Sequence, residues 1–206
     1  MKKLKEILNI SSCHQQEDFS KKFSEIAKAL MTSYCIYNGV YKYRPVEIEF
    51  YLYVKGLHED THVYKRDDKA AGSLFFHYSG MDICFESHFE KGVFGGILIR
   101  ALERVDNKDN KTYFFGGPLV CLNEVLNTAS KKCKIISLES EEQYAPKSPS
   151  LQRVGLSQKK AFWDKKYRFI REKSPNPIVM SFPEFDFKSG NKSEKNRPSK
   201  YFLYKI

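Results

Sequence analysis

Long apolar runs are absent from this sequence, and so are the motifs of several common enzyme classes. No stretch approaches the roughly 20 apolar residues that a transmembrane helix needs. The chain contains no Walker A motif, no GxGxxG and no GxSxG, and no lysine has the surroundings of a nucleophile. The sequence therefore gives no support for phosphoryl transfer, dinucleotide binding or serine-hydrolase chemistry.

The five cysteines show no pairing pattern. They form no CxxC motif, and an odd number cannot pair completely within one chain. They are Cys13, Cys35, Cys84, Cys121 and Cys133. The opening residues, MKKLKEILNI, are too basic and too poor in apolar residues for an export signal. We therefore expect free thiols and a reducing, cytoplasmic location.

Positive charge and aromatic rings are abundant. The 206 residues carry a formal net charge of +10, and 15% of them are aromatic. Such a balance favours polyanionic partners, such as nucleic acid or an anionic membrane surface, although lysines also serve solubility alone. The length predicts one domain, with residues 1–14 as an N-terminal extension and residues 187–200 as a polar, mobile tail or surface loop.

Apolar periodicity predicts the helices and strands. Helical spacing runs from Glu17 to Met31 and again over residues 117–129, where Pro118 suits the first turn. Asn38-Gly39 predicts a hairpin with a type I′ turn, and residues 54–72 a long functional loop. Strands are predicted at residues 46–53, 73–80, 81–87, 95–103, 134–139 and 167–171. This order indicates an α+β domain with a mostly antiparallel sheet.

The strand VEIEFYLY (Val46–Tyr53) carries unusual side chains on its second face. Its aliphatic residues point one way, while two carboxylates and two phenols point the other. A carboxylate buried among aromatic rings has a raised pKa, which makes Glu49 a candidate general base near neutral pH. The alternative is that Glu47 and Glu49 simply pair with basic residues on a neighbouring strand.

An arginine interrupts the apolar strand GGILIRALE. Arg100 is costly there unless it meets a carboxylate or a phosphate, and an Arg–Glu pair within the sheet is the structural alternative. The segment HEDTH places His58 and His62 four residues apart with Asp60 between them, which leaves a metal-dependent hydrolase as a further alternative. The glutamate of HExxH is missing, so stacking or hydrogen bonding is the favoured role of these histidines.

Seven motifs in one order resemble the mammalian type of alkyladenine (3-methyladenine) DNA glycosylases. They lie between about residues 26 and 177 and read VEIEFYLY, HEDTH, GSLFFHYSGMDICFE, GGILIRALE, GGPLVCLNEVL, QRVGL and YRFI. The family shows VETEAYxG, an acidic loop ending in His, GTLYVYxxYGMxxCxN, LLRALEP, a GP helix, PRxGV and RFY. The resemblance implies a curved, mostly antiparallel sheet with flanking helices in a monomer that needs no cofactor and no membrane.

The resemblance also implies an activity: release of alkylated or deaminated purines from DNA by water attack on the N-glycosidic bond. Glu49 matches the acid that deprotonates the water, and Arg100 the residue that orients it, while Glu47 is left structural. The implied base-binding positions are Tyr51, His62, His77 and Glu86. The implied DNA-binding positions are Tyr78, Ser79, Arg153 and Arg168.

Some family positions differ in this chain. Ser79 stands where the family inserts a tyrosine into the duplex, the turn is one residue shorter, and Glu86 replaces the asparagine that helps exclude guanine. A serine cannot fill the gap of an extruded base by stacking, so we expect a preference for mismatched or single-stranded DNA. A nucleic-acid or base-binding relative without glycosylase activity is the main alternative.

Overall fold

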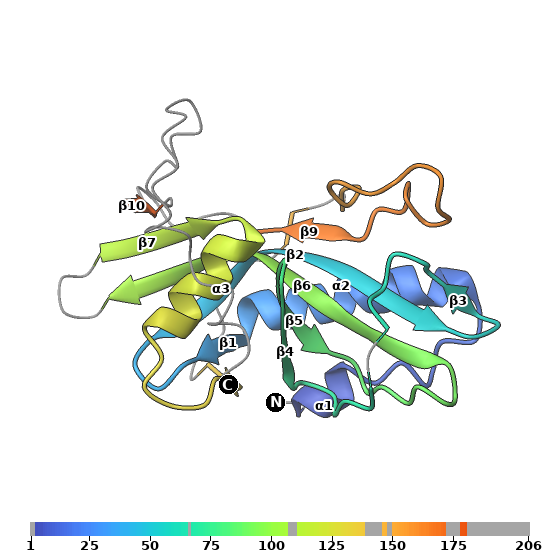
Figure 1. Ribbon diagram of the computed structural model, residues 1–206, viewed down its shortest axis with the longest axis horizontal. Helices are drawn as coiled ribbons and strands as arrows, with labels where there is room; N and C mark the ends of the chain where they lie inside the picture. The colour runs from blue at the N-terminus through green and yellow to red at the C-terminus, as the bar shows by residue number, and fades with distance from the viewer. Residues whose placement is uncertain are drawn as a thin grey trace, which may run out of the picture.

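One large, curved sheet organises the protein, and helices pack on it (Figure 1). The computed structural model describes residues 3–65, 67–106, 111–138, 146–147, 150–171 and 178–180. Within these ranges the sheet has ten strands, and every strand pair is antiparallel except the pairing of the strand at 178–180. The predicted α+β class with a mostly antiparallel sheet is therefore confirmed. The predicted tail at residues 187–200 lies outside the described residues.

The helices are α1 (Leu4–Ile7), α2 (Gln16–Thr32) and α3 (Pro118–Asn127). The strands are β1 (Tyr34–Tyr37), β2 (Lys42–Val54), β3 (His58–Glu59), β4 (Leu74–His77), β5 (Gly80–Cys84), β6 (Val93–Asp106), β7 (Lys111–Gly116), β8 (Lys134–Ser137), β9 (Arg168–Ile170) and β10 (Ile178–Met180). The main path through the sheet is β10-β7-β6-β2-β1-β8. The short strands β3 and β9 pair with β2, and the β4–β5 hairpin joins the sheet through β6.

The helix α2 begins and ends within one residue of its predicted bounds. At its start the Asp18 carboxylate accepts hydrogen bonds from the backbone N–H groups of His14 and Gln15, at 2.9 and 3.1 Å. These two hydrogen bonds satisfy backbone N–H groups just before the helix, and they lower the pKa of Asp18 because they stabilise its charged form. The apolar stripe packs on the sheet, with the Phe23 ring stacked on Phe50 of β2 at 4.5 Å between centroids.

The hairpin at Asn38-Gly39 exists, but its turn is not type I′. Four residues connect β1 to β2, and Gly39 is the residue there with positive φ, at 95°. The Asn38 side chain closes the loop because its Oδ1 accepts the N–H groups of Val40 and Tyr41, at 3.1 and 2.9 Å. A Cβ at position 39 would lie 2.8 Å from the backbone nitrogen of Lys131, so this close approach requires glycine.

The central strand β2 buries its aliphatic face as predicted, but its pairing with β6 is irregular. Pro45 pairs with Leu102, Glu47 with Ala101, and Ile48 with Ile99. The register thus passes over Val46 on β2 and then over Arg100 on β6, as β-bulges do. The strand periodicity could not show these two irregularities.

Several elements were not predicted. The strand β7 was missed, and the N-terminal extension contains α1, whose following residue Leu8 is buried in the core. The five cysteines are free thiols, as expected. None of the helices in the described ranges combines the length and apolarity needed to cross a membrane.

Candidate active site

A cavity of about 470 Å³ opens where β2 and β6 meet the β4–β5 hairpin and the loop after residue 150. Six residues predicted for the site line it: Tyr51, His62, His77, Tyr78, Ser79 and Arg100. Further lining residues are Tyr64, Asp82, Leu98, Pro118, Val154, Gly155, Leu156 and Lys160. Aromatic rings, two basic side chains and one carboxylate thus surround the same space.

Glu49 lies fully buried behind the lining of this cavity, hydrogen-bonded to three residues that line it: Tyr51, Arg100 and Val154. Its Oε1 accepts the backbone N–H of Val154 at 2.8 Å. Its Oε2 accepts the phenol of Tyr51 at 2.8 Å and faces Nη1 of Arg100 at 3.4 Å. A carboxylate offers about four lone-pair directions, so these three donors leave roughly one of them unused.

Burial raises the pKa of Glu49, although the Arg100 charge and the two hydrogen bonds oppose that rise. Burial also raises the pKa of Tyr51, and the charge of Glu49 adds to the effect. The phenol of Tyr51 therefore stays protonated and donates to the carboxylate. Glu49 has the environment of a general base whose proton affinity exceeds that of an ordinary glutamate.

Arg100 connects the two acids of the strand. Its Nε donates to Oε1 of Glu47 at 2.8 Å, while Nη1 approaches Glu49. Although burial disfavours the cation, Glu49 and then Glu47 raise the pKa of Arg100 overall. The Arg–Glu pairing considered as the structural alternative is thus present. The side chain nevertheless keeps 19% of its surface exposed at the cavity, where it can also contact a ligand.

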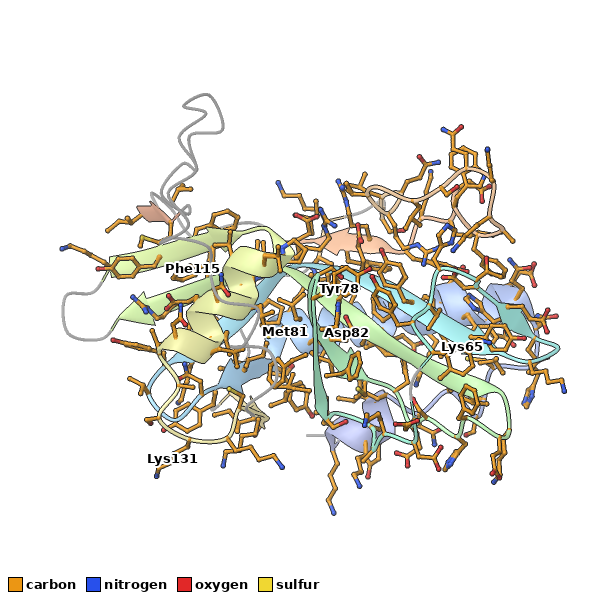
Figure 2. All side chains as sticks on the ribbon, viewed as in Figure 1. Lys65, Tyr78, Met81, Asp82, Phe115 and Lys131 are labelled. Carbon is orange, nitrogen blue, oxygen red and sulfur yellow. The ribbon has the colours of Figure 1, made fainter. Side chains whose placement is uncertain are left out.

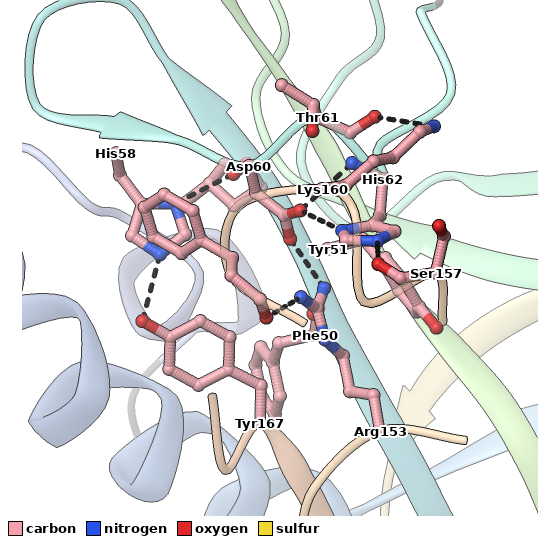
Figure 3. A network of polar contacts seen from close by, with 12 residues as sticks. Phe50, Tyr51, His58, Asp60, Thr61, His62, Arg153, Ser157, Lys160 and Tyr167 are labelled. Carbon is pink, nitrogen blue, oxygen red and sulfur yellow. Dashed lines mark hydrogen bonds and ion pairs between the residues drawn. The ribbon is translucent and has the colours of Figure 1, made fainter. Parts of the chain in front are cut away.

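Arg153, which the resemblance assigned to DNA binding, is buried. It is 5% exposed, and its guanidinium donates to the Asp60 carboxylate and to the backbone carbonyls of Phe50 and Phe162 (Figure 3). It also lies over the Tyr51 ring, 4.6 Å from its centroid. The side chain that the resemblance assigned to DNA instead packs against Tyr51, which lines the cavity, and its charge is neutralised inside the protein by Asp60.

Asp60 binds both Arg153 and His62. Its Oδ1 accepts the backbone N–H of His62 at 3.0 Å and lies 3.1 Å from the ring Nδ1 (Figure 3). The other ring nitrogen, Nε2, faces the carbonyl of Ser157 at 3.3 Å. This carboxylate therefore orients the wall that His62 contributes to the cavity.

The alternative metal site in HEDTH is not formed. His58 is fully buried, with Nδ1 at 2.8 Å from the Leu52 carbonyl and Nε2 at 3.1 Å from the Tyr167 hydroxyl. Because a carbonyl only accepts, Nδ1 carries the proton and Nε2 accepts, which leaves no lone pair for a metal. Burial lowers the pKa of His58. Within the described ranges, no group of three or more His, Cys, Asp or Glu side chains could hold a metal ion.

The β4–β5 hairpin forms another wall of the cavity. His77 pairs with Gly80, so Tyr78 and Ser79 form a two-residue turn inside the segment 73–80 that was predicted as one strand. Figure 2 labels Tyr78 and Asp82 close together near the middle of the view, on this hairpin. Asp82 pairs with Leu98 of β6, and Leu98 pairs with Glu49 of β2. The carboxylates of Glu49 and Asp82 therefore project from one face of the sheet, two strands apart.

Besides Glu49 and Arg153, which lie behind the lining, two more predicted site residues do not line this cavity, Glu86 and Arg168. Glu86 lines a different cavity of about 480 Å³, beside Leu8 and Cys13, and accepts the backbone N–H of Ala71 at 2.8 Å. It does not face a base held near Glu49, so this prediction is corrected. Arg168 lies on β9, where its Nε is 3.8 Å from Glu47 and has no hydrogen-bond partner.

Sequence reasoning did not assign Tyr64, Asp82 or Lys160, which the structure brings to the cavity. Asp82 could have been identified from the sequence, because burying an acid within the apolar run MDICF is as costly as burying Arg100 within its strand. Comparison with known proteins adds nothing to the assignment. No protein-family model matches the chain, and no curated protein matches it. The resemblance to the glycosylases therefore depends on the seven motifs alone.

Proposed function

We propose that this protein is a monofunctional N-glycosyl hydrolase that releases modified purine bases from DNA. The observation that carries the proposal is the buried Glu49, with its raised pKa and one remaining acceptor direction, beside Arg100 and an aromatic cavity. The order of the seven motifs supports the same activity. The net charge of +10 suits a polyanionic substrate.

In the proposed reaction the target nucleotide leaves the stack and its base enters the cavity. The rings of Tyr51 and His62 hold the base, and an alkylated purine gains from cation–π attraction because it carries positive charge. Glu49 takes a proton from a water molecule that attacks C1′ of the sugar. The bond between C1′ and the base nitrogen breaks, and its electron pair leaves with the base. No amine is required, so no strand cleavage should follow.

Arg100 has two roles in this scheme. It keeps Glu49 ionised through its charge, and it orients the attacking water or contacts a phosphate next to the extruded nucleotide. Tyr78 stands at the hairpin tip with 70% of its surface exposed. It is the aromatic residue best placed to contact the bases that flank the extruded nucleotide.

A screen of oligonucleotides tests the function. Each oligonucleotide carries one modified purine in a paired duplex, a mismatch or a single strand, and all are compared at one salt concentration. We expect release of a free base and an abasic product for at least one alkylated or deaminated purine. Binding without release would favour the alternative of a base-binding relative, and neither binding nor release at low salt would contradict the proposal.

The pH dependence of base release follows from the raised pKa of Glu49. The base works only when ionised, so kcat/KM should rise with pH through a pKa that lies above the ordinary value of about 4.3. The stability of the fold changes with pH in the opposite direction. Because the pKa of Glu49 is higher in the folded than in the unfolded protein, this group stabilises the fold at pH values below its unfolded pKa. That contribution is lost as the pH rises through its folded pKa. This prediction is checked by measuring kcat/KM for base release as a function of pH, with DNA affinity measured at each pH to separate binding from chemistry. An acid limb at the ordinary glutamate pKa would contradict it.

A further inference from the structure

The β4–β5 hairpin holds a serine, a histidine and an aspartate in hydrogen-bonded sequence. The Oγ of Ser79 lies 2.9 Å from Nδ1 of His77. The Nε2 of the same ring lies 3.2 Å from Oδ1 of Asp82. Both distances are within the range that joins a nucleophile to its base and a base to its orienting group. Asp82 is 3% exposed, so its carboxylate faces the histidine in a nearly dry environment.

The surrounding donors fix the direction of these hydrogen bonds. The backbone N–H of Ser79 points at Nδ1 of His77 at 3.4 Å, and a backbone N–H can only donate. Nδ1 therefore presents its lone pair, and the ring proton of the neutral imidazole lies on Nε2, toward Asp82. The Ser79 hydroxyl can then donate to Nδ1. This is the protonation state in which a histidine removes a proton from a serine.

Packing keeps the three residues in place at the cavity. The Phe75 ring stacks on His77, with centroids 5.7 Å apart. A Cβ at Gly80 would lie 2.8 Å from Cβ of Pro118, so glycine allows the turn to sit directly against the start of α3. Ser79, His77 and Asp82 all line the 470 Å³ cavity, which gives a substrate access to them.

We propose that Ser79 is a nucleophile, activated by His77 and Asp82, that hydrolyses small carboxylic esters bearing an anionic group. Arg100 and Lys160 line the same cavity and favour the anion. This activity needs neither DNA nor Glu49 as a base, so it is independent of the proposed base excision. The GxSxG motif is absent because this serine lies in a β-hairpin turn, whereas that motif places serine between a strand and a helix.

The reaction is balanced with water as the second substrate. Oγ of Ser79 attacks the ester carbonyl carbon while its proton moves to Nδ1 of His77. The bond to the alcohol oxygen breaks, and that oxygen leaves with the proton from His77. Water then attacks the acyl-serine, again giving its proton to His77, and Ser79 takes that proton as the acid leaves. Asp82 stabilises the imidazolium in both steps.

The Tyr78 phenol can stabilise the negative oxygen that forms during the attack, and the Tyr64 phenol positions it. The Tyr64 hydroxyl lies 3.3 Å from Oγ of Ser79 and donates to the Tyr78 hydroxyl at 2.8 Å. The Tyr78 hydroxyl keeps its own proton to donate toward the cavity. A tyrosine hydroxyl serves as an oxyanion donor when it is held in position, and the hydrogen bond from Tyr64 holds the Tyr78 hydroxyl.

Labelling with a fluorophosphonate, followed by intact mass measurement and peptide mapping, tests the nucleophile in the absence of DNA. We expect one adduct per chain, on Ser79, and its loss in Ser79→Ala. Asp82→Asn should slow labelling by ~10²–10⁴-fold because it removes the group that supports the base. Ser24→Ala, a substitution in the exposed face of α2, is the matched control and should label like the parent.

Turnover is measured with p-nitrophenyl acetate and with the anionic p-nitrophenyl succinate. We expect a burst of p-nitrophenolate near one equivalent, a higher kcat/KM for the succinate, and loss of both in Ser79→Ala. Circular dichroism of each variant separates loss of the nucleophile from loss of the fold. Absence of an adduct in the folded parent protein, or equal labelling of the parent and Ser79→Ala, would overturn the proposal.

Discussion

Glu49→Gln is expected to lower base release by ~10²–10⁴-fold while DNA affinity stays close to that of the parent protein. The amide has nearly the same size as the carboxyl group, and its oxygen can still accept hydrogen bonds from two of the three donors around it. It cannot take a proton from water. The rate is measured under single-turnover conditions, so that product release does not mask the chemical step.

The matched control is Glu47→Gln, which makes the same chemical change on the same face of β2. Glu47 also bonds to Arg100, at 2.8 Å, but its side chain is 22% exposed, whereas Glu49 is fully buried and also accepts hydrogen bonds from Tyr51 and Val154. This variant should retain far more activity than Glu49→Gln. Undiminished release by Glu49→Gln would exclude Glu49 as the base, and equal losses in both variants would assign the effect to Arg100 instead.

Asp60→Ala is expected to destabilise the fold by about 3–5 kcal/mol. The side chains of Asp60 and Arg153 are both fully buried, and removal of the carboxylate leaves the guanidinium without a counter-charge. His62 would also lose the acceptor of its backbone N–H and the partner of its Nδ1. Urea unfolding of the parent and the variant measures the change in the free energy of unfolding.

A second substitution shows whether the lone charge causes this loss. Asp60→Ala combined with Arg153→Met should be more stable than Asp60→Ala alone, because the double variant buries no unpaired cation. Glu59→Ala, next to Asp60 in the sequence but exposed, serves as the surface control and should shift stability little. If Asp60→Ala unfolds at the same urea concentration as the parent, the buried ion pair is not the support that the structure indicates.

Elements with a local pattern of apolar residues could be predicted from the amino-acid order. The 3.6-residue period of α2 and the alternation of β2 appear because one face of each element is buried, so the order of apolar residues carries the information. The proximity of Glu49 and Arg100 was also foreseeable, because each is a charge on an apolar strand and needs a partner. The strand β7 was missed because the run KTYFFG is short and follows the polar residues NKDN.

The charges that face the cavity could not be predicted from the sequence, because they depend on the packing of distant segments. Arg153 and Arg168 look alike in the sequence, yet one is neutralised inside the protein by Asp60 and the other lies beside Glu47. The bulges that pass over Val46 and Arg100 depend on the register between two strands fifty residues apart. His77 and Asp82 meet because β4 and β5 pair across a two-residue turn. Such contacts depend on strand register and on the loops that cover a site, and a local pattern of residues contains neither.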